Sequence, residues 1–412
     1  MQYLKVSSNG SYFLFMTLLY VVSPLLCFII ALLLYRRTVS HFFYVAYAFF
    51  FGYQLGANYD LMMHYQNYLT FWDRSFVESY TDFETLYLGQ EPFHFVFKYL
   101  LSRFNASQRV FSGCACAIYA IIVTFYLRQY QHIYRGRMDF SQLLLLFIMA
   151  VVIEYYWYFG LRFWNGAFIF MILYSKHVIT GKKIYIFLTP LCLLFHVAMA
   201  TVVVVAFASH LLKNQRLVTY LLFATSFVFK FISFKFDKMM ASFGFVKSFY
   251  KVNYQKDFYH KAIEKVTKEK LLEGNFVYNN RIPLMLFFFF IVVFALWVKN
   301  KNVNRRYSQM FAMILLMIAF ANIGYSDYVF YERFLKFAAL IAYSYMFLLL
   351  AEPANKWICK HLFVTVPLLA IGVLSLVIAL VQQRLIISDL SLWLGNFFSD
   401  VSLSEIHNNG YK

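Results

Sequence analysis

Acidic residues and several familiar enzyme motifs are scarce or missing in this sequence. Only 19 of its 412 residues are Asp or Glu, and no two aspartates are separated by a single residue. The metal-binding Asp-x-Asp signature common to many nucleotide-sugar enzymes is therefore absent. The chain also has no P-loop, no Gly-x-Gly-x-x-Gly segment and no nucleophile elbow around a serine, which argues against chemistry on cytosolic nucleotides.

Proline, glycine and cysteine are also few, and each shortage excludes something. With 6 Pro and 15 Gly, the chain has little room for linkers or disordered segments. The 5 cysteines lie mostly in apolar runs, and Cys114 and Cys116 stand two apart, which is not the spacing of a zinc or redox pair. Glu91 and His94 alone are weak evidence for a metal. We expect no disulfide framework, no metal and no cofactor.

Apolar side chains dominate what is present. The sequence is 62% hydrophobic, 22% aromatic and 14% charged, with a mean hydropathy of +0.61, which indicates a chain surrounded mainly by lipid. Its net charge of +18 would suit nucleic acid in a soluble protein, but membrane proteins concentrate Lys and Arg in cytoplasmic loops. We expect one integral membrane domain over 1–412, without internal repeats and without a nucleic acid partner.

Long apolar runs predict the membrane-spanning segments. An open backbone cannot be satisfied in hydrocarbon, so each run of roughly 17–25 residues must be helical. The first, Tyr12–Tyr35, is too long for a signal peptide core and is expected to remain as a span. The others are predicted at 39–57, 109–127, 140–159, 161–179, 184–212, 217–232, 282–298, 307–325, 334–351 and 362–381. With 184–212 counted twice, the sequence predicts an all-α polytopic membrane protein with about 12 transmembrane segments.

Basic loops orient these spans, because Lys and Arg favour the cytoplasmic side. All the basic loops lie on the cytoplasmic side of the membrane only if the run Ile184–Leu212 enters the membrane and returns to the same side. We therefore predict a hairpin of two short helices that bends near Phe195–Ala200, with His196 at its tip. About 14 residues reach only about 21 Å as a helix, so the tip would lie below the outer surface.

The same topology predicts three hydrophilic segments on the outer face. Residues 58–108 form an outer loop with an interfacial helix, and 386–412 form an amphipathic, flexible tail. The largest insert, 233–281, carries ten Lys or Arg against five Asp or Glu. It is either a solvated cap with interfacial lysines or a lid that attracts an anionic substrate, and the sequence leaves both open.

Polar residues gather at the predicted outer ends of the spans. Arg162 could pair with Glu154 across the turn at Gly160, and Arg333 could be held by a neighbouring carboxylate. The acids could serve as helix-terminal charges, and His196 could be an ordinary core histidine. Charges inside membrane spans nevertheless mark function more often than decoration. The candidates are Asp60, Tyr65, Glu91, Glu154, Arg162, His196, Asp327, Glu332 and Arg333.

These residue types point to one kind of chemistry. Guanidinium groups match phosphate oxygens well, so two outward-facing arginines favour an anionic ligand. Carboxylates and a histidine nearby are suited to removing a proton from a hydroxyl group. A lipid phosphate donor and a hydroxyl acceptor satisfy both demands without ATP or a metal.

Five short motifs occur in order along the chain. They are Gly56–Tyr65 with the pattern G-x-x-Y-D, Glu91–Phe93 (EPF), 160–167 (GLRFWNGA), 181–200 (GKK to FHVAMA) and 331–340 (YERFLKFAAL). Together they resemble the EpsG-like, Wzy-type family of bacterial polysaccharide polymerases. The chain departs from the commoner R-Q-x-x-A form of the third motif, because phenylalanine follows the arginine.

The resemblance implies a membrane glycosyltransferase of GT-C-like plan. Such a polymerase joins oligosaccharide repeat units carried on undecaprenyl pyrophosphate into O-antigen, capsule or exopolysaccharide. It works in the bacterial cytoplasmic (inner) membrane, with its active site facing the periplasm or outside. The implied partners are these lipid-linked oligosaccharides, membrane lipids and a chain-length regulator.

The resemblance also suggests roles for the candidates. The predicted pyrophosphate-binding residues are Arg162, Arg333 and Arg281, of which Arg162 and Arg333 would bind the departing pyrophosphate. The lysines of 233–281 would hold a second lipid diphosphate. The base that activates the sugar hydroxyl would be Asp60, Glu91 or His196, and the sequence does not rank them. Supporting roles fall to Tyr65, Glu154, Asp327 and Glu332.

Three other functions share some of these features. A lipid-linked oligosaccharide flippase also needs cations, but it should carry charge along a full transmembrane path and show repeated halves. An O-antigen ligase differs only in its acceptor. A membrane acyltransferase would need an early histidine near its acyl donor, and His41 is a poor candidate.

Overall fold

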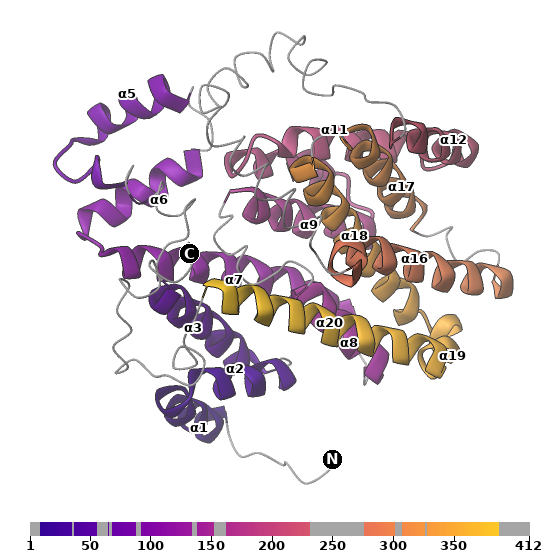
Figure 1. The fold of residues 1–412 in the computed structure, drawn as a ribbon, viewed down its shortest axis with the longest axis horizontal. Helices are drawn as coiled ribbons and strands as arrows, with labels where there is room; N and C mark the ends of the chain where they lie inside the picture. Colours follow the sequence, from indigo (N-terminus) through magenta and orange to yellow (C-terminus); the bar gives the residue numbers. More distant parts are fainter. Residues whose placement is uncertain are drawn as a thin grey trace.

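The structure is a computed structural model in which the described residues form helices and no strands (Figure 1). This confirms the all-helical prediction for that part of the chain. Figure 1 shows α1–α3 at one side of the helical assembly and α12 and α16 at the other. The described residues are 9–34, 37–55, 65, 68–87, 92–133, 138–151, 162–230, 276–300, 307–325 and 328–386.

Several described helices are long and apolar enough to cross a membrane. Three pass on length and hydropathy, at Gln108–Gln131, Arg281–Lys299 and Phe330–Ala351. A fourth is a bent pair, Pro353–Cys359 with Leu362–Val377, whose axes differ by 71°. Five shorter apolar helices of 10–17 residues accompany them. The described part of the chain is therefore compatible with a membrane protein.

The first predicted span is broken into two helices, α1 (Asn9–Val22) and α2 (Pro24–Leu33). Pro24 cannot donate a helical hydrogen bond, and Ser23 before it is extended with φ −150°. The chain turns back at this point, because the Cys27 thiol lies 3.4 Å from the Met16 carbonyl oxygen. The prediction of one continuous helix over Tyr12–Tyr35 was therefore wrong, since hydropathy alone does not register the helix-breaking pair.

The predicted outer loop 58–108 holds two described helices where the sequence predicted one. They are α5 (Phe76–Tyr87) and α6 (Pro92–Arg103). Ser75 and Glu78 form a reciprocal capping box at the start of α5, with the Glu78 carboxylate accepting from Ser75 N at 2.9 Å. The long helix α7 (Gln108–Ile133) follows and packs along α3 (Thr38–Leu55).

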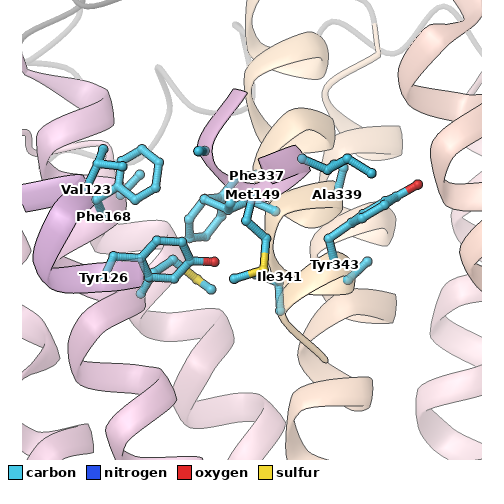
Figure 2. Packing of buried hydrophobic residues seen from close by; sticks show 14 of the residues in the cluster. Val123, Tyr126, Met149, Phe168, Phe337, Ala339, Ile341 and Tyr343 are labelled. Carbon is cyan, nitrogen blue, oxygen red and sulfur yellow. The ribbon is translucent and has the colours of Figure 1, made fainter. Parts of the chain in front are cut away.

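The centre of the assembly is α18 (Tyr328–Ala351), whose spanning window is 94% buried. It packs against α8 (Phe140–Val151) and α17 (Ser308–Ile323). Figure 2 shows this core from close by, with Phe168 against Val123 and Tyr126 and with Phe337 and Ile341 of α18 beside Met149. Tyrosine–serine hydrogen bonds join some of the helices, such as Tyr130 to Ser175 at 2.6 Å, and satisfy these two buried hydroxyls across a helix interface.

The remaining helices surround this centre. α9 spans Phe163–Thr180, α10 spans Ile184–Leu188 and α11 spans Met199–Leu212. The later helices are α12 (Arg216–Ser226), η3 (Phe227–Lys230), α16 (Phe276–Lys299), η4 (Pro353–Asn355), α19 (Lys356–Cys359) and α20 (Leu362–Ile386). In Figure 1 the yellow helix α20 runs beside α8, and the two are in contact.

The fold-back predicted for Ile184–Leu212 is present. After α10 the chain continues as a 3₁₀ helix, η2 (Thr189–Leu194), and the break over 195–198 precedes α11. The rings of Phe187 and Phe207 lie 6.0 Å apart, which a straight helix of this length would not allow. The break falls where the sequence placed the bend, and His196 lies within it.

Candidate functional site

The break before α11 places His196 against the start of α9. Gly166 makes this approach possible, because a Cβ there would lie 2.9 Å from Met199 Cγ and 3.1 Å from the Cys192 carbonyl oxygen. The glycine of the "RFWNGA" stretch is therefore needed for space. It allows the first turn of α9 to pack directly on the broken segment.

Two arginines from distant parts of the chain converge on His196. Arg162 is the N-cap residue of α9, and Arg333 lies in the second turn of α18. Both act electrostatically on the His196 ring. The Phe163 ring contacts both His196 and Arg333, with its centroid 5.7 Å from the His196 ring and 5.8 Å from the Arg333 Cζ. The structure therefore brings together three residues that the sequence assigned to one site.

The hydrogen bonding of His196 fixes its tautomer. The backbone N–H of Ala198 donates to His196 Nδ1 at 3.0 Å. A nitrogen that accepts a hydrogen bond carries no proton, so the ring is neutral and its proton resides on Nε2. In this arrangement His196 presents an N–H donor to its surroundings. It is better suited to binding an oxyanion than to removing a proton through Nε2.

A second histidine joins the cluster from α6. His94 is 4% exposed, and the adjacent Phe93 ring packs 4.2 Å from the ring of Phe195 in the break. Burial holds the pKa of His94 well below its usual value, and the charges of Arg162 and Lys98 lower it further. The buried ring is therefore neutral near pH 7, beside at least two cations.

More cations lie at the same end of α18. Lys230 donates to the Tyr331 hydroxyl at 3.3 Å and lies over the Tyr325 ring at 5.5 Å. Lys336 is 2% exposed in its side chain and pairs with Glu332 at 2.6 Å. Glu332 is thus the partner of a lysine one turn away on the same helix, a pair that the sequence analysis did not predict.

Arg281 differs from its predicted setting. It was assigned to the end of an outer loop, yet it lies within α16 and is 3% exposed. The helix begins at Phe276, so the insert ends before residue 281. α16 and α18 run in the same direction, since Tyr343 bonds to the Met285 carbonyl oxygen and Tyr345 packs on Phe289. Arg281 is consequently at the same end of the assembly as Arg333.

The other predicted site residues are elsewhere or outside the described residues. Tyr65 packs on Tyr68 and Phe111, with ring centroids 5.2 and 5.8 Å away, so its described contacts are aromatic. Those outside the described residues are Asp60, Glu91, Glu154 and Asp327, together with the insert 233–275 and the tail 387–412. Among described residues, no group of three His, Cys, Asp or Glu side chains could hold a metal.

Sequence reasoning missed two polar residues of this region. Asn165 is 0% exposed, and neither amide atom has a hydrogen-bond partner in the described part of the chain. His94 was considered only as half of a weak metal pair. The available signal was the same for both: a polar side chain inside a run of aromatic and apolar residues.

Comparisons with protein-family models, curated proteins and solved structures found no match to this chain.

Proposed function

We propose that this protein is a membrane glycosyltransferase that polymerises undecaprenyl-pyrophosphate-linked oligosaccharide repeat units. The observation that carries the proposal is the convergence of Arg162 and Arg333 on His196. Two guanidinium groups beside an imidazole N–H donor form a set of donors that suits an anionic ligand. A pyrophosphate is such an anion, and guanidinium groups bind it through paired hydrogen bonds.

The reaction follows from these donors. An acceptor sugar hydroxyl attacks the anomeric carbon of the donor, the bond from that carbon to the phosphate oxygen breaks, and its electron pair leaves on undecaprenyl pyrophosphate. Arg162 and Arg333 offset the charge that develops on the leaving group. His196 donates its Nε2–H to the same oxyanion. The hydroxyl proton passes to Asp60 or Glu91, the two remaining candidates for the base.

The surrounding architecture completes the proposal. About twelve transmembrane segments in a GT-C-like arrangement would place the site at the outer face of a bacterial cytoplasmic membrane. Arg281 and the lysines of 233–275 would bind the diphosphate of the second lipid-linked substrate. The product would be O-antigen, capsule or exopolysaccharide, whose length a separate regulator can set.

Reconstitution tests the proposal directly. Purified protein in proteoliposomes, given a defined undecaprenyl-pyrophosphate oligosaccharide, should form a ladder of longer products. Arg162→Ala and Arg333→Ala should each reduce polymer formation at least about 100-fold. The matched control is Arg74→Ala, because Arg74 is an exposed arginine remote in sequence from the cluster. Labelled lipid that moves across the membrane without any change in product length would instead identify a flippase.

The role of His196 needs its own variants. If Nε2–H donates to the leaving group, His196→Gln keeps a donor and should lose less than about tenfold in turnover, whereas His196→Phe should lose about 100-fold. If the ring were the base, both variants would fall equally, because an amide cannot accept the proton. Both measurements use folded protein, checked by its elution profile in detergent.

A further inference from the structure

A basic cleft lies at the ends of α9 and α11 that are remote from His196. Its volume is about 330 Å³, at the small end of the range for small-molecule sites. None of the residues that line it is acidic. The polar lining comes from the turn after α9, the end of α11 and the start of α17, and includes His177, Lys183, His210, Lys213, Ser308 and Gln309.

Gln309 links the two histidines of this cleft. Its Oε1 lies 3.2 Å from His177 Nε2 and 3.1 Å from His210 Nδ1. The other ring nitrogen of His177, Nδ1, lies 3.0 Å from the Lys182 carbonyl oxygen. Carbonyl oxygens only accept hydrogen bonds, so in this arrangement both nitrogens of His177 donate. The geometry therefore corresponds to a positively charged His177.

The amide nitrogen of Gln309 is the feature that points to a ligand. The residue is 9% exposed, and its Nε2 has no hydrogen-bond partner among described residues. Turning the amide over would let Nε2 donate to both histidines in their neutral forms. The carbonyl oxygen would then replace the amide nitrogen at the unpartnered position. When the two histidines are charged, the Gln309 amide therefore offers its nitrogen as a donor to the cleft. When they are neutral, it offers its oxygen as an acceptor.

Other groups of the cleft favour negative charge as well. Lys183 is exposed and Lys213 half-buried, and both line the cleft. α17 has 16 residues and begins at Ser308, and the side chain of its N-cap residue Tyr307 makes no capping hydrogen bond. The first-turn N–H groups of such a helix attract anions. Two ammonium groups, a helix start and a buried amide donor therefore border one space.

We infer that this cleft binds a phosphate group, and that binding is strongest when His177 and His210 are protonated. The titratable side chains that face the histidine pair are Lys183, Lys213 and Tyr174, whose hydroxyl donates to the Gln309 backbone oxygen at 3.2 Å. None of these competes for the anion as a carboxylate would. The inference is independent of the proposed polymerase function, because the cleft lies about 20 Å from His196 along α11.

The test measures binding of inorganic phosphate and sulfate to the full chain in non-ionic detergent at constant ionic strength. Wild-type protein should bind both saturably at pH 5.5, as measured by calorimetry. Gln309→Glu retains an acceptor for both histidines but replaces the donor with a negative oxygen, so affinity should fall at least tenfold. Lys183→Gln with Lys213→Gln should have a similar effect. Lys182→Gln is the matched control, because Lys182 adjoins Lys183 but its side chain does not line the cleft.

The pH dependence separates the histidines from the lysines. Sulfate keeps its charge between pH 5.5 and 8, whereas histidine loses its charge in this range. Sulfate affinity should therefore fall at least tenfold at pH 8, and the loss should be absent in Gln309→Glu. A site made by lysines alone would bind sulfate equally at both values, which would overturn the coupling to histidine.

The phosphate could come from a soluble compound or from a lipid headgroup. Thermal stability distinguishes these sources. The melting temperatures of wild-type protein and of the cleft variants are compared in nanodiscs of phosphatidylglycerol and of phosphatidylcholine. Stabilisation by phosphatidylglycerol that requires Gln309 and both lysines would identify a headgroup. Stabilisation by dissolved phosphate alone would identify a soluble ligand. If neither depends on these residues, the cleft is not an anion site.

Discussion

The two ends of the α9–α11 pair carry similar side chains in different surroundings. At one end His196 lies against Phe163, with Arg162 and Arg333 acting on it, and Gly166 leaves no spare room. At the other end His177 and His210 border a cleft of about 330 Å³. The hydrogen-bond partners differ as well. A backbone N–H donates to His196 Nδ1 and makes that ring neutral, whereas the Gln309 amide between His177 and His210 suits charged rings through its oxygen and neutral rings through its nitrogen.

This comparison shows that residue type alone does not set the role of a histidine. Both ends combine imidazole with cations, yet the His196 ring packs against Phe163 whereas His177 and His210 line a cleft. Close packing around His196 favours exact positioning of a ligand, as the polymerase proposal requires. An open basic cleft favours exchange with dissolved or surface-bound anions. The predictions below test whether the two ends respond differently, beginning with the largest effect.

The largest effect should follow from separating Glu332 from Lys336 at the His196 end. Glu332→Gln removes the carboxylate from an ammonium that is 2% exposed, so unfolding free energy should fall by about 3 kcal/mol. Lys336→Met should cost less, because the Glu332 side chain is 24% exposed and can reach solvent. The double variant should recover most of the loss. Equal costs for both single variants, measured by denaturation in detergent, would contradict a buried lysine held by this pair.

Two glycines should differ in what they tolerate. Gly166→Ala forces a Cβ against Met199 and Cys192, which should cost about 1–3 kcal/mol and lower polymer formation. Gly181 has φ +70° and nothing within 4 Å of an added Cβ. Gly181→Asn should therefore cost only a few tenths of a kcal/mol, because asparagine accepts the left-handed region. A comparable loss at both positions would show that space is not the restriction at Gly166.

Asn165 should separate stability from activity. An unpartnered buried amide costs about 1–3 kcal/mol, so Asn165→Leu should leave the folded protein as stable as wild type or about 1 kcal/mol more stable. If the amide contacts substrate, the same variant should reduce polymerisation at least about tenfold. Melting in detergent and the ladder assay measure the two quantities. A destabilised variant with normal turnover per folded molecule would assign Asn165 to structure alone.

The smallest effect should be a pH dependence from His94. Its folded-state pKa is lowered by burial and by Arg162 and Lys98, so only the unfolded chain binds a proton just below about pH 6.5. The unfolding free energy should then fall as pH drops, by at most about 1.4 kcal/mol per unit, and should show no His94 contribution above about pH 7. His94→Gln should flatten the profile between pH 7.5 and 5.5. An unchanged slope in the variant would mean that His94 is not held neutral.

The features that could be predicted from the sequence are those set by the charge and hydropathy of individual segments. Counting basic loops predicted that 184–212 folds back, and the Phe187–Phe207 contact confirms it. The same topology predicted that Arg162, His196 and Arg333 share one end. The fold-back and the grouping around His196 could be predicted because the insertion cost of a charge is a property of each segment alone, and the membrane face on which these residues lie stays a prediction.

Features set by local backbone geometry or by contacts with distant residues could not be predicted from hydropathy and charge. The 3₁₀ segment Thr189–Leu194 and the break at Pro24 are of the first kind, because a hydropathy average does not register the conformation of single residues. Arg281 looked like a loop residue because the start of its helix is polar. Gln309 gave no signal at all, since its importance depends on two histidines that are 99 and 132 residues away.

The spacing of Glu332 and Lys336 has a consequence for biogenesis. Four residues apart on one helix, they can form their ion pair before α18 meets any other helix. As a membrane span, the segment would enter the lipid with its two charges already offset, carrying much less of the penalty that either charge would incur alone. Among the three single-helix candidate spans, the one that is most buried, at 94% of its window, would therefore tolerate a stage at which lipid surrounds it on every side.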